Sequence, residues 1–135
     1  EITKSSLTLV SETSYDYVIP IPLDHTKRLE RQFNQSELIA RFVSKETGIL
    51  IQNSILTKRC KTPLQSRLSR KERLANLYGT FQIKNNQPIK GKKILLVDDI
   101  LTTGATAEEA ARMLKSNGAR QVDVFALART EVHPS

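Results

Sequence analysis

The feature that most constrains the fold is a strand, loop, helix and strand pattern in the last third of the chain. Residues Ile94 to Val97 form a continuous apolar run, as expected of a central parallel strand covered on both faces. A helical pattern follows and ends at Asn117-Gly118, and Val122 to Leu127 is typical of another buried strand. The right-handed crossover of such a unit makes its two strands parallel. The sequence therefore predicts an α/β fold with an open, mainly parallel sheet and flanking helices. The apolar helical positions are Ala107, Ala110, Ala111 and Leu114.

Upstream patterns add a strand and a helix. Tyr17 to Ile19 is predicted to be a short buried strand that ends before Pro20-Ile21-Pro22, where two amide donors are missing. Asn34 with Glu37 has the pattern of a helix cap, and the predicted helix ends at Gly48. Its apolar positions are Leu38, Ile39, Phe42 and Val43, and we expect Phe42 and Phe33 to lie in the core.

The middle of the chain carries weaker signals. Ile49 to Thr57 is predicted to hold a second strand, centred on residues 54–56. Ser69 and Glu72 have a cap pattern, so Arg70 to Leu77 is expected to be a short helix. A strand over Gly79 to Lys84 and a loop over Asn85 to Gly91 complete the pattern. We therefore expect a lead-in over residues 1–16, one domain over 17–130 and a tail over 131–135.

Composition narrows the class of protein. At 135 residues, 39% apolar and 26% charged, the chain has the size and composition of one soluble globular domain. It has no apolar run near the roughly 18 residues of a membrane span and no pattern of a signal peptide, so a cytoplasmic location is expected. The lone Cys60 is expected to be a bystander thiol. With His25 and His133 it makes no ligand set for structural zinc.

The net charge of +7 is concentrated in one segment. Lys58 to Arg73 contains seven basic residues and one acid, Glu72, for a net charge of +6. Two interpretations stay open at this point. The segment is either a solvated basic loop and helix, or a surface that meets phosphates on a small ligand or a polynucleotide.

The loop from Asp98 to Thr106 has the properties of an anion site. Ligands of open α/β sheets bind beyond the carboxyl ends of the strands, where this loop is expected. The helix that begins near Ala105 directs its positive end into the loop, and Gly104 permits a tight turn. Thr102, Thr103 and Thr106 add hydroxyl donors. In the alternative interpretation the threonines only cap the helix, with Thr106 and Glu109 forming a capping box.

Asp98 and Asp99 indicate that the ligand is more than a bare phosphate, which two carboxylates would repel. They can accept hydrogen bonds from sugar hydroxyls, bind a magnesium ion, or do both. A phosphorylated ribose satisfies both halves of the loop. The sequence contains neither a P-loop nor a G-x-G-x-x-G motif. Only 36 residues follow Asp99, too few for a response-regulator receiver fold.

The stretch "ILLVDDILTTGAT", residues 94–106, closely resembles the phosphoribosyl-pyrophosphate (PRPP) loop of type I phosphoribosyltransferases. The stretches "VIPIPL", "RQFNQSELIAR", "TPLQSRLSRKERLANLYGTF" and "VDVFALAR" are similar, in order and spacing, to the ComF family of competence-associated phosphoribosyltransferase-like proteins. The resemblance covers residues 18–129. It implies a type I phosphoribosyltransferase-like fold.

The resemblance also implies roles for individual residues. Asp98 and Asp99 would hold the ribose 2′ and 3′ hydroxyls and, directly or indirectly, Mg²⁺, while the pyrophosphate of PRPP would lie near the loop after the first strand. The segment from Lys61 to Arg73 resembles a mobile loop that closes over PRPP. The implied 5′-phosphate ligands are Thr102, Thr103, Gly104, Ala105 and Thr106; the implied pyrophosphate residues are Pro20, Ile21, Pro22, Leu23, Arg59, Lys61, Arg67 and Arg73.

Two functions follow as hypotheses. The first is a Mg²⁺-dependent phosphoribosyltransferase that acts in DNA uptake and displaces pyrophosphate from PRPP. The second is a non-catalytic module of the same fold that binds single-stranded DNA through the Lys58 to Arg73 surface, or binds a partner of the competence machinery. Many family members carry a zinc-binding segment upstream, so we expect part of the acceptor-recognising hood to be missing here. The acceptor and the oligomeric state stay open.

Overall fold

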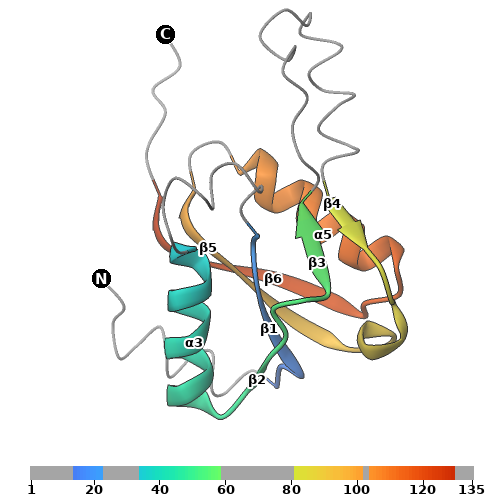
Figure 1. Ribbon diagram of the computed structural model, residues 1–135, viewed down its shortest axis with the longest axis horizontal. Helices are drawn as coiled ribbons and strands as arrows, with labels where there is room; N and C mark the ends of the chain where they lie inside the picture. The colour runs from blue at the N-terminus through green and yellow to red at the C-terminus, as the bar shows by residue number, and fades with distance from the viewer. Residues whose placement is uncertain (1–13, 23–33, 59–80, 102–103, 130–135) are drawn as a thin grey trace, which may run out of the picture.

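A computed structural model describes residues 14–22, 34–58, 81–101 and 104–129 of the protein, and its centre is a four-stranded sheet (Figure 1). The strands are β1 (Tyr17–Pro20), β2 (Leu50–Ile51), β5 (Lys93–Leu101) and β6 (Gln121–Arg129), in the order β2-β1-β5-β6. All neighbouring strands are parallel. The predicted α/β class and the parallel β5–α5–β6 unit are confirmed.

The two long helices cover opposite faces of this sheet. Figure 1 shows α3 (Gln35–Thr47) on one side and α5 (Ala105–Ser116) on the other. Alternate residues of the central strands point to opposite faces, so Leu95 and Val97 pack towards α3, while Ile94 and Leu96 pack towards α5. The result is three layers with two separate apolar cores, and β5 contributes to both.

A second, two-stranded sheet lies on the α5 side. It pairs β3 (Leu56–Lys58) with β4 (Phe81–Ile83) in antiparallel orientation, and Leu56 and Phe81 join the α5-side core. Residues 49–57 were predicted to hold one strand centred on residues 54–56, but they hold β2 and the start of β3, because exposed residues Asn53 and Ser54 turn the chain from the main sheet into this hairpin. Of the strand predicted over residues 79–84, the described part is β4.

Helix α3 begins and ends where the sequence predicts. The Asn34 side chain accepts a hydrogen bond from the Ser36 amide at 3.0 Å, and Gly48 ends the helix in the left-handed region at φ 79°. Phe42, however, is 43% exposed, so its prediction as a core residue was wrong. The helix turns its Ile39, Ala40 and Val43 face to the sheet, which leaves Phe42 and Leu38 on its flank.

Strand β1 extends one residue further than predicted, to Pro20, although proline has no amide donor. The Val18 carbonyl accepts from Gln52 on the β2 side, and the Ile21 amide donates to Val97 on the β5 side, at 2.9 and 2.8 Å. Because alternate residues of a parallel strand bond to opposite neighbours, Pro20 is directed to the β2 side. Strand β2 has already ended there, at Ile51, so the missing donor costs no ladder bond.

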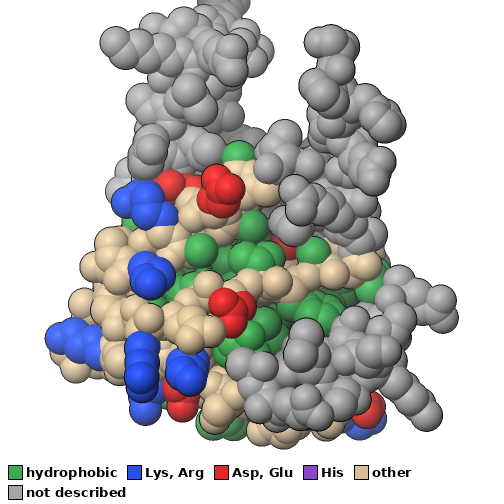
Figure 2. Space-filling view, turned by 180° about the vertical axis from the view of Figure 1, so that it is seen from behind, with side chains coloured by type: hydrophobic (Ala, Val, Ile, Leu, Met, Phe, Trp, Pro, Cys, Tyr) green, Lys and Arg blue, Asp and Glu red, His purple; other side chains and the backbone are tan. Residues whose placement is uncertain are grey.

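Strand β6 forms one edge of the main sheet. Its prediction as a fully buried strand was wrong, since Val124 and Leu127 are 40% and 37% exposed. Figure 2 shows the molecule from behind the view of Figure 1. Hydrophobic side chains gather across the middle of this rear face, and lysine and arginine side chains lie along one side of it.

Several predictions lie outside the described residues: most of the lead-in, the tail, the helix over residues 70–77 and Phe33. Within the predicted loop at residues 85–91 a short 3-10 helix, η2 (Gln87–Ile89), forms. None of the described helices has the length and apolar character needed to cross a membrane.

Candidate functional site

The connections of the sheet create a switch point between β1 and β5. From β1 the chain passes through α3 to β2 on one side, and from β5 it passes through α5 to β6 on the other. Because the two helices cover opposite faces, a crevice is expected where the carboxyl ends of β1 and β5 meet. Ligands of open α/β sheets bind at this position.

Asp98 and Asp99 lie at this switch point, within β5 and not in a loop after it. Strand β1 ends with Pro20 beside Val97, whereas β5 continues to Leu101 because β6 pairs with it beyond that point, for example at Ala126 beside Asp98. Both carboxylates therefore extend past the end of β1. The sequence analysis predicted them in the loop after the strand, because the sequence does not show how far β6 pairs along β5.

The two aspartates interact with each other. The Asp99 amide donates to Oδ1 of Asp98 at 2.9 Å. Burial raises the pKa of Asp98 to about 6, and a side-chain hydrogen bond with Asp99 and its negative charge add to the rise, whereas the Asp99 amide and the positive charge of Lys58 oppose it. At neutral pH Asp98 is mostly ionised, although burial makes its charged form less favourable. A bound cation or hydroxyl donor would offset that desolvation cost.

Lys58 is a site residue that sequence reasoning missed. It ends β3, its ammonium lies 5.8 Å from the centre of the Phe81 ring, and its charge acts on Asp98. The hairpin brings it to the α5 face of the sheet, which Asp98 shares with Leu96 by strand alternation. In the sequence Lys58 is only the first residue of the basic segment. The β3–β4 hairpin shows that its charge acts on Asp98.

The start of α5 supplies positive polarity next to the carboxylates. Gly104 is the N-cap in the left-handed region at φ 81°, and as a glycine it offers no side chain of its own to cap the helix. Ala105 and Thr106 are the first two helical residues, so the positive end of the helix dipole is directed to the carboxyl end of β5. An anion is stabilised at such a position.

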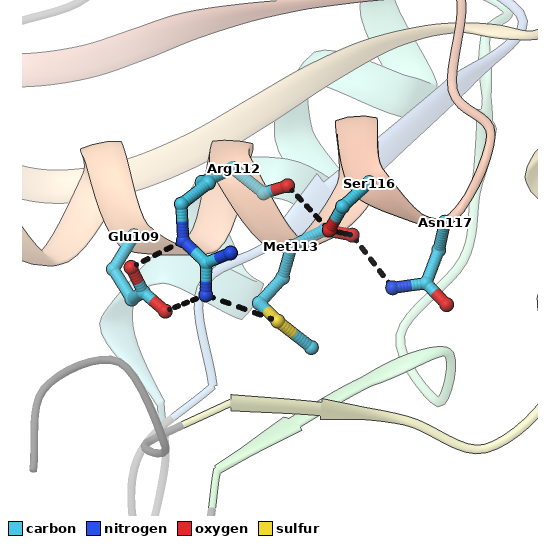
Figure 3. Close-up of polar contacts among 5 residues, drawn as sticks. All are labelled: Glu109, Arg112, Met113, Ser116 and Asn117. Atoms are coloured by element: carbon cyan, nitrogen blue, oxygen red, sulfur yellow. Dashed lines mark hydrogen bonds and ion pairs between the residues drawn. The ribbon is translucent and has the colours of Figure 1, made fainter.

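The capping box that the alternative interpretation placed between Thr106 and Glu109 does not form, and the other two threonines of that interpretation, Thr102 and Thr103, lie outside the described residues. Thr106 lies inside the helix, and the carboxylate of Glu109 is bound instead by Arg112, at 2.9 and 2.6 Å (Figure 3). Figure 3 shows this pair at the start of a row of polar contacts along α5 that continues to Met113, Ser116 and Asn117. Glu109 therefore stabilises the helix and does not cap it.

The loop after β1 reaches the same crevice. Asn34, the N-cap of α3, donates from Nδ2 to the Ile21 carbonyl at 3.0 Å, and the Ile21 amide binds Val97. The Ile21 side chain is buried in the α5-side core, and its amide and carbonyl are both hydrogen-bonded within the protein, whereas Pro22 is half-buried. The other predicted ligands, Leu23, Arg59, Lys61, Arg67, Arg73, Thr102 and Thr103, lie outside the described residues.

The donor set fits one kind of metal. Among the described residues no group of three or more Asp, Glu, His or Cys side chains could hold an ion. The site offers two adjacent carboxylates, which suits Mg²⁺, because this ion keeps several waters and takes its remaining oxygens from a substrate. Asp98 and Asp99 are the residues that would hold it.

Comparison with known proteins identifies the family. Residues 3–132 match the family model described as phosphoribosyl transferase domain. The chain belongs to this family. This phosphoribosyl transferase domain is also 35% identical over 115 residues to Competence protein F of Haemophilus influenzae, covering 83% of the chain and 49% of that protein. It is 35% identical over 130 residues to Competence protein ComFC of Bacillus subtilis, covering 93% of the chain and 50% of that protein.

These matches confirm the resemblance to the ComF family, and the domain spans about half the length of the curated relatives it matches. A further relative, "DNA utilization protein YhgH" of Escherichia coli O157:H7, is 35% identical over 115 residues, with 85% of the chain and 50% of that protein covered.

Solved structures confirm the fold. A purine phosphoribosyltransferase from Pyrococcus horikoshii superimposes with a TM-score of 0.59 at 20% identity, covering 96% of this chain and 73% of that one. The glutamine PRPP amidotransferase from B. subtilis gives 0.60 at 21% identity, covering 89% and 24%.

Proposed function

We propose that this domain binds PRPP, or another ribose 5-phosphate compound, together with Mg²⁺ at the carboxyl end of β5. The observation that carries the proposal is the order of groups along the chain at the switch point. Two carboxylates extend past the end of β1, and the positive end of α5 follows them within a few residues. A ligand with a diol beside a phosphate matches both groups.

In this proposal each group acts through position and charge. Asp98 and Asp99 accept hydrogen bonds from the ribose hydroxyls, and residues 102–106 bind the 5′-phosphate. The backbone of residues 20–23 and the basic residues Arg59, Lys61, Arg67 and Arg73 face the pyrophosphate. Mg²⁺, when bound, neutralises charge on the pyrophosphate and so makes it a better leaving group.

The reaction class is displacement at ribose C1. The bond from C1 to the pyrophosphate oxygen breaks, the pyrophosphate leaves with the electron pair, and a nucleophile of the acceptor forms the new bond to C1. No covalent enzyme nucleophile is needed, because orientation and charge stabilisation suffice for such a step.

The names of the relatives support a role in DNA uptake or utilisation. Those names refer to competence and DNA use. For this reason a second function is kept, in which the fold binds DNA or a competence partner without transfer chemistry. Release of pyrophosphate from PRPP, measured with a coupled enzymatic assay, distinguishes the two functions.

The proposal is tested by calorimetric titration of the purified chain with PRPP, with and without Mg²⁺. We expect Mg²⁺-dependent binding that Asp98→Asn and Asp99→Asn each weaken at least about tenfold, the effect of losing a hydrogen bond to a charged group. Glu46→Gln, an exposed carboxylate on α3, is the matched control and should leave the affinity unchanged. Equal affinity in all four proteins would remove the proposal.

A further inference from the structure

Five cationic residues gather at the amino end of the sheet, opposite Asp98 and Asp99. We call this group the amino-edge basic surface. It draws on four places in the chain: the turn after η2, the first residue of β5, the last turn of α5 and the residue before β6. All five side chains are exposed or half-buried, and Figure 2 shows lysine and arginine side chains along one side of the rear face. The residues are Lys90, Lys92, Lys93, Lys115 and Arg120.

Short backbone contacts hold these residues together. The Gly91 amide donates to the Gly118 carbonyl at 2.8 Å, and the Arg120 amide donates to the Lys92 carbonyl at 2.9 Å. The Lys90 side chain lies against Gly118, where an added Cβ would meet its Cγ at 3.1 Å. The Gly118 amide in turn donates to the Lys115 carbonyl. The surface is therefore built on tight turns that fix where each side chain starts.

The charges of this surface are not neutralised by neighbouring described residues. The ion pairs within the described ranges are Arg41 with Glu37 and Arg112 with Glu109, and neither includes a member of the surface. The nearby described acids are Asp16, whose carboxylate accepts the Lys93 amide at 2.8 Å, and Asp123, whose carboxylate accepts hydrogen bonds from Tyr15 and Gln121. Lys115 has a second explanation, since a cation in the last turn of a helix is favoured by the dipole. That explanation does not extend to the other four.

We propose that the amino-edge basic surface binds the sugar–phosphate backbone of single-stranded DNA. Within the described ranges these cations have no ion-pair partner, and such a row of cations is the electrostatic feature that a polyanion recognises. None of the five is an aromatic residue that could stack on a base, so the contacts are to phosphates and are independent of base sequence. The link to DNA rests on the proposed function, whereas the choice of surface rests on the charges.

The position of the surface separates it from the ribose-phosphate site. Lys93 and Asp98 are five residues apart on one strand, which places them about 17 Å apart at the rise of an extended chain. DNA and PRPP therefore bind at opposite ends of β5 and do not compete. Binding of DNA to the basic segment 58–73, which includes Lys58 beside Asp98, predicts competition instead.

The test measures fluorescence anisotropy of a labelled 20-nucleotide oligo-dT with the full chain. We expect the affinity to fall about 50-fold between 50 and 200 mM salt, as about four phosphate contacts require. Arg120→Glu and Lys90→Glu should each weaken binding about fivefold to tenfold at 100 mM salt. Lys45→Glu, on the exposed side of α3, makes the same change in net charge and should have little effect.

Three results would overturn the assignment. Equal losses in Arg120→Glu and Lys45→Glu would mean that only net charge matters. Displacement of the oligonucleotide by PRPP would place DNA at the carboxyl end. Binding to phosphatidylglycerol vesicles without binding to the oligonucleotide would identify a different polyanion. Asp98→Asn separates the two proposals, because it should weaken PRPP binding and leave DNA binding unchanged.

Discussion

The two ends of β5 have opposite electrostatic character. At its carboxyl end two carboxylates are partly buried at a crevice, close to a single described lysine, Lys58. At its amino end five cations lie on the surface, and the described acids near them are Asp16 and Asp123. One strand thus presents a site suited to a hydroxyl-bearing, metal-bound ligand at one end and a surface suited to a polyanion at the other. The strand between them is apolar and belongs to both cores.

The largest effect is expected from a change midway between the two ends. Leu96 has no exposed surface, so Leu96→Ala removes contacts in the α5-side core and leaves a cavity that costs about 2–5 kcal/mol of unfolding free energy. Urea denaturation measures this loss. Val124→Ala on β6, which is 40% exposed, is the control and should cost less than about 1 kcal/mol. Similar costs for both changes would mean that β5 is not the common support of the two ends.

A smaller effect is expected at the carboxyl end alone. Asn34→Ala removes the cap of α3 and the hydrogen bond to the Ile21 carbonyl, which should cost about 1 kcal/mol and weaken PRPP binding without affecting DNA. The matched change is Asn85→Ala, which removes an exposed hydrogen bond to the Gln87 amide and should cost about half as much. Thermal unfolding and the two binding assays measure these effects. A loss of DNA affinity in Asn34→Ala would contradict the separation of the ends.

The smallest effect is a pH-dependent gain in stability. The pKa of Asp98 is raised from its ordinary 3.8 to about 6 in the folded protein, so its ionisation costs stability that grows between pH 3.8 and 6 and is complete above pH 6. Asp98→Asn should therefore raise the Tm at pH 7.5 by about 2 °C, a small value because solvent screens the half-exposed site. At about pH 3, below both pKa values, the Tm should not change.

Asp16→Asn provides the opposite comparison. It removes the acid beside the basic surface and should lower the Tm at pH 7.5. Differential scanning calorimetry at the two pH values distinguishes the variants. A lower Tm for both variants at pH 7.5 would mean that the burial of Asp98 is not a cost to the fold.

The sequence predicted best what local patterns control. Strand β5 and helices α3 and α5 were found because an apolar run, helical spacing and the Asn34 and Gly48 caps lie within each element. The split of residues 49–57 into β2 and β3 was missed, because both strands are short and the pairing partner of each is remote in the chain.

Of the candidate site, the sequence predicted the two carboxylates and the start of α5 but missed the neighbours of Asp98. Lys58 reaches it only through the β3–β4 hairpin, a long-range contact with no local signature. The amino-edge basic surface was missed for the same reason. Its residues are spread over positions 90–120: Lys90, Lys92 and Lys93 form a short cluster, whereas Lys115 and Arg120 are remote from it in the sequence.

Pro20 ends the pairing of β1 with β2 next to the candidate site. Any other residue at this position would offer an amide towards β2, and the ladder between β1 and β2 could then lengthen past Ile51 and draw the following chain over the crevice. Proline therefore ends the hydrogen-bonded ladder between β1 and β2. The chain after β1 stays hydrogen-bonded to β5 at Val97, but Pro20 offers no amide to β2. The β1–β2 pairing therefore does not extend across the carboxyl end of β1.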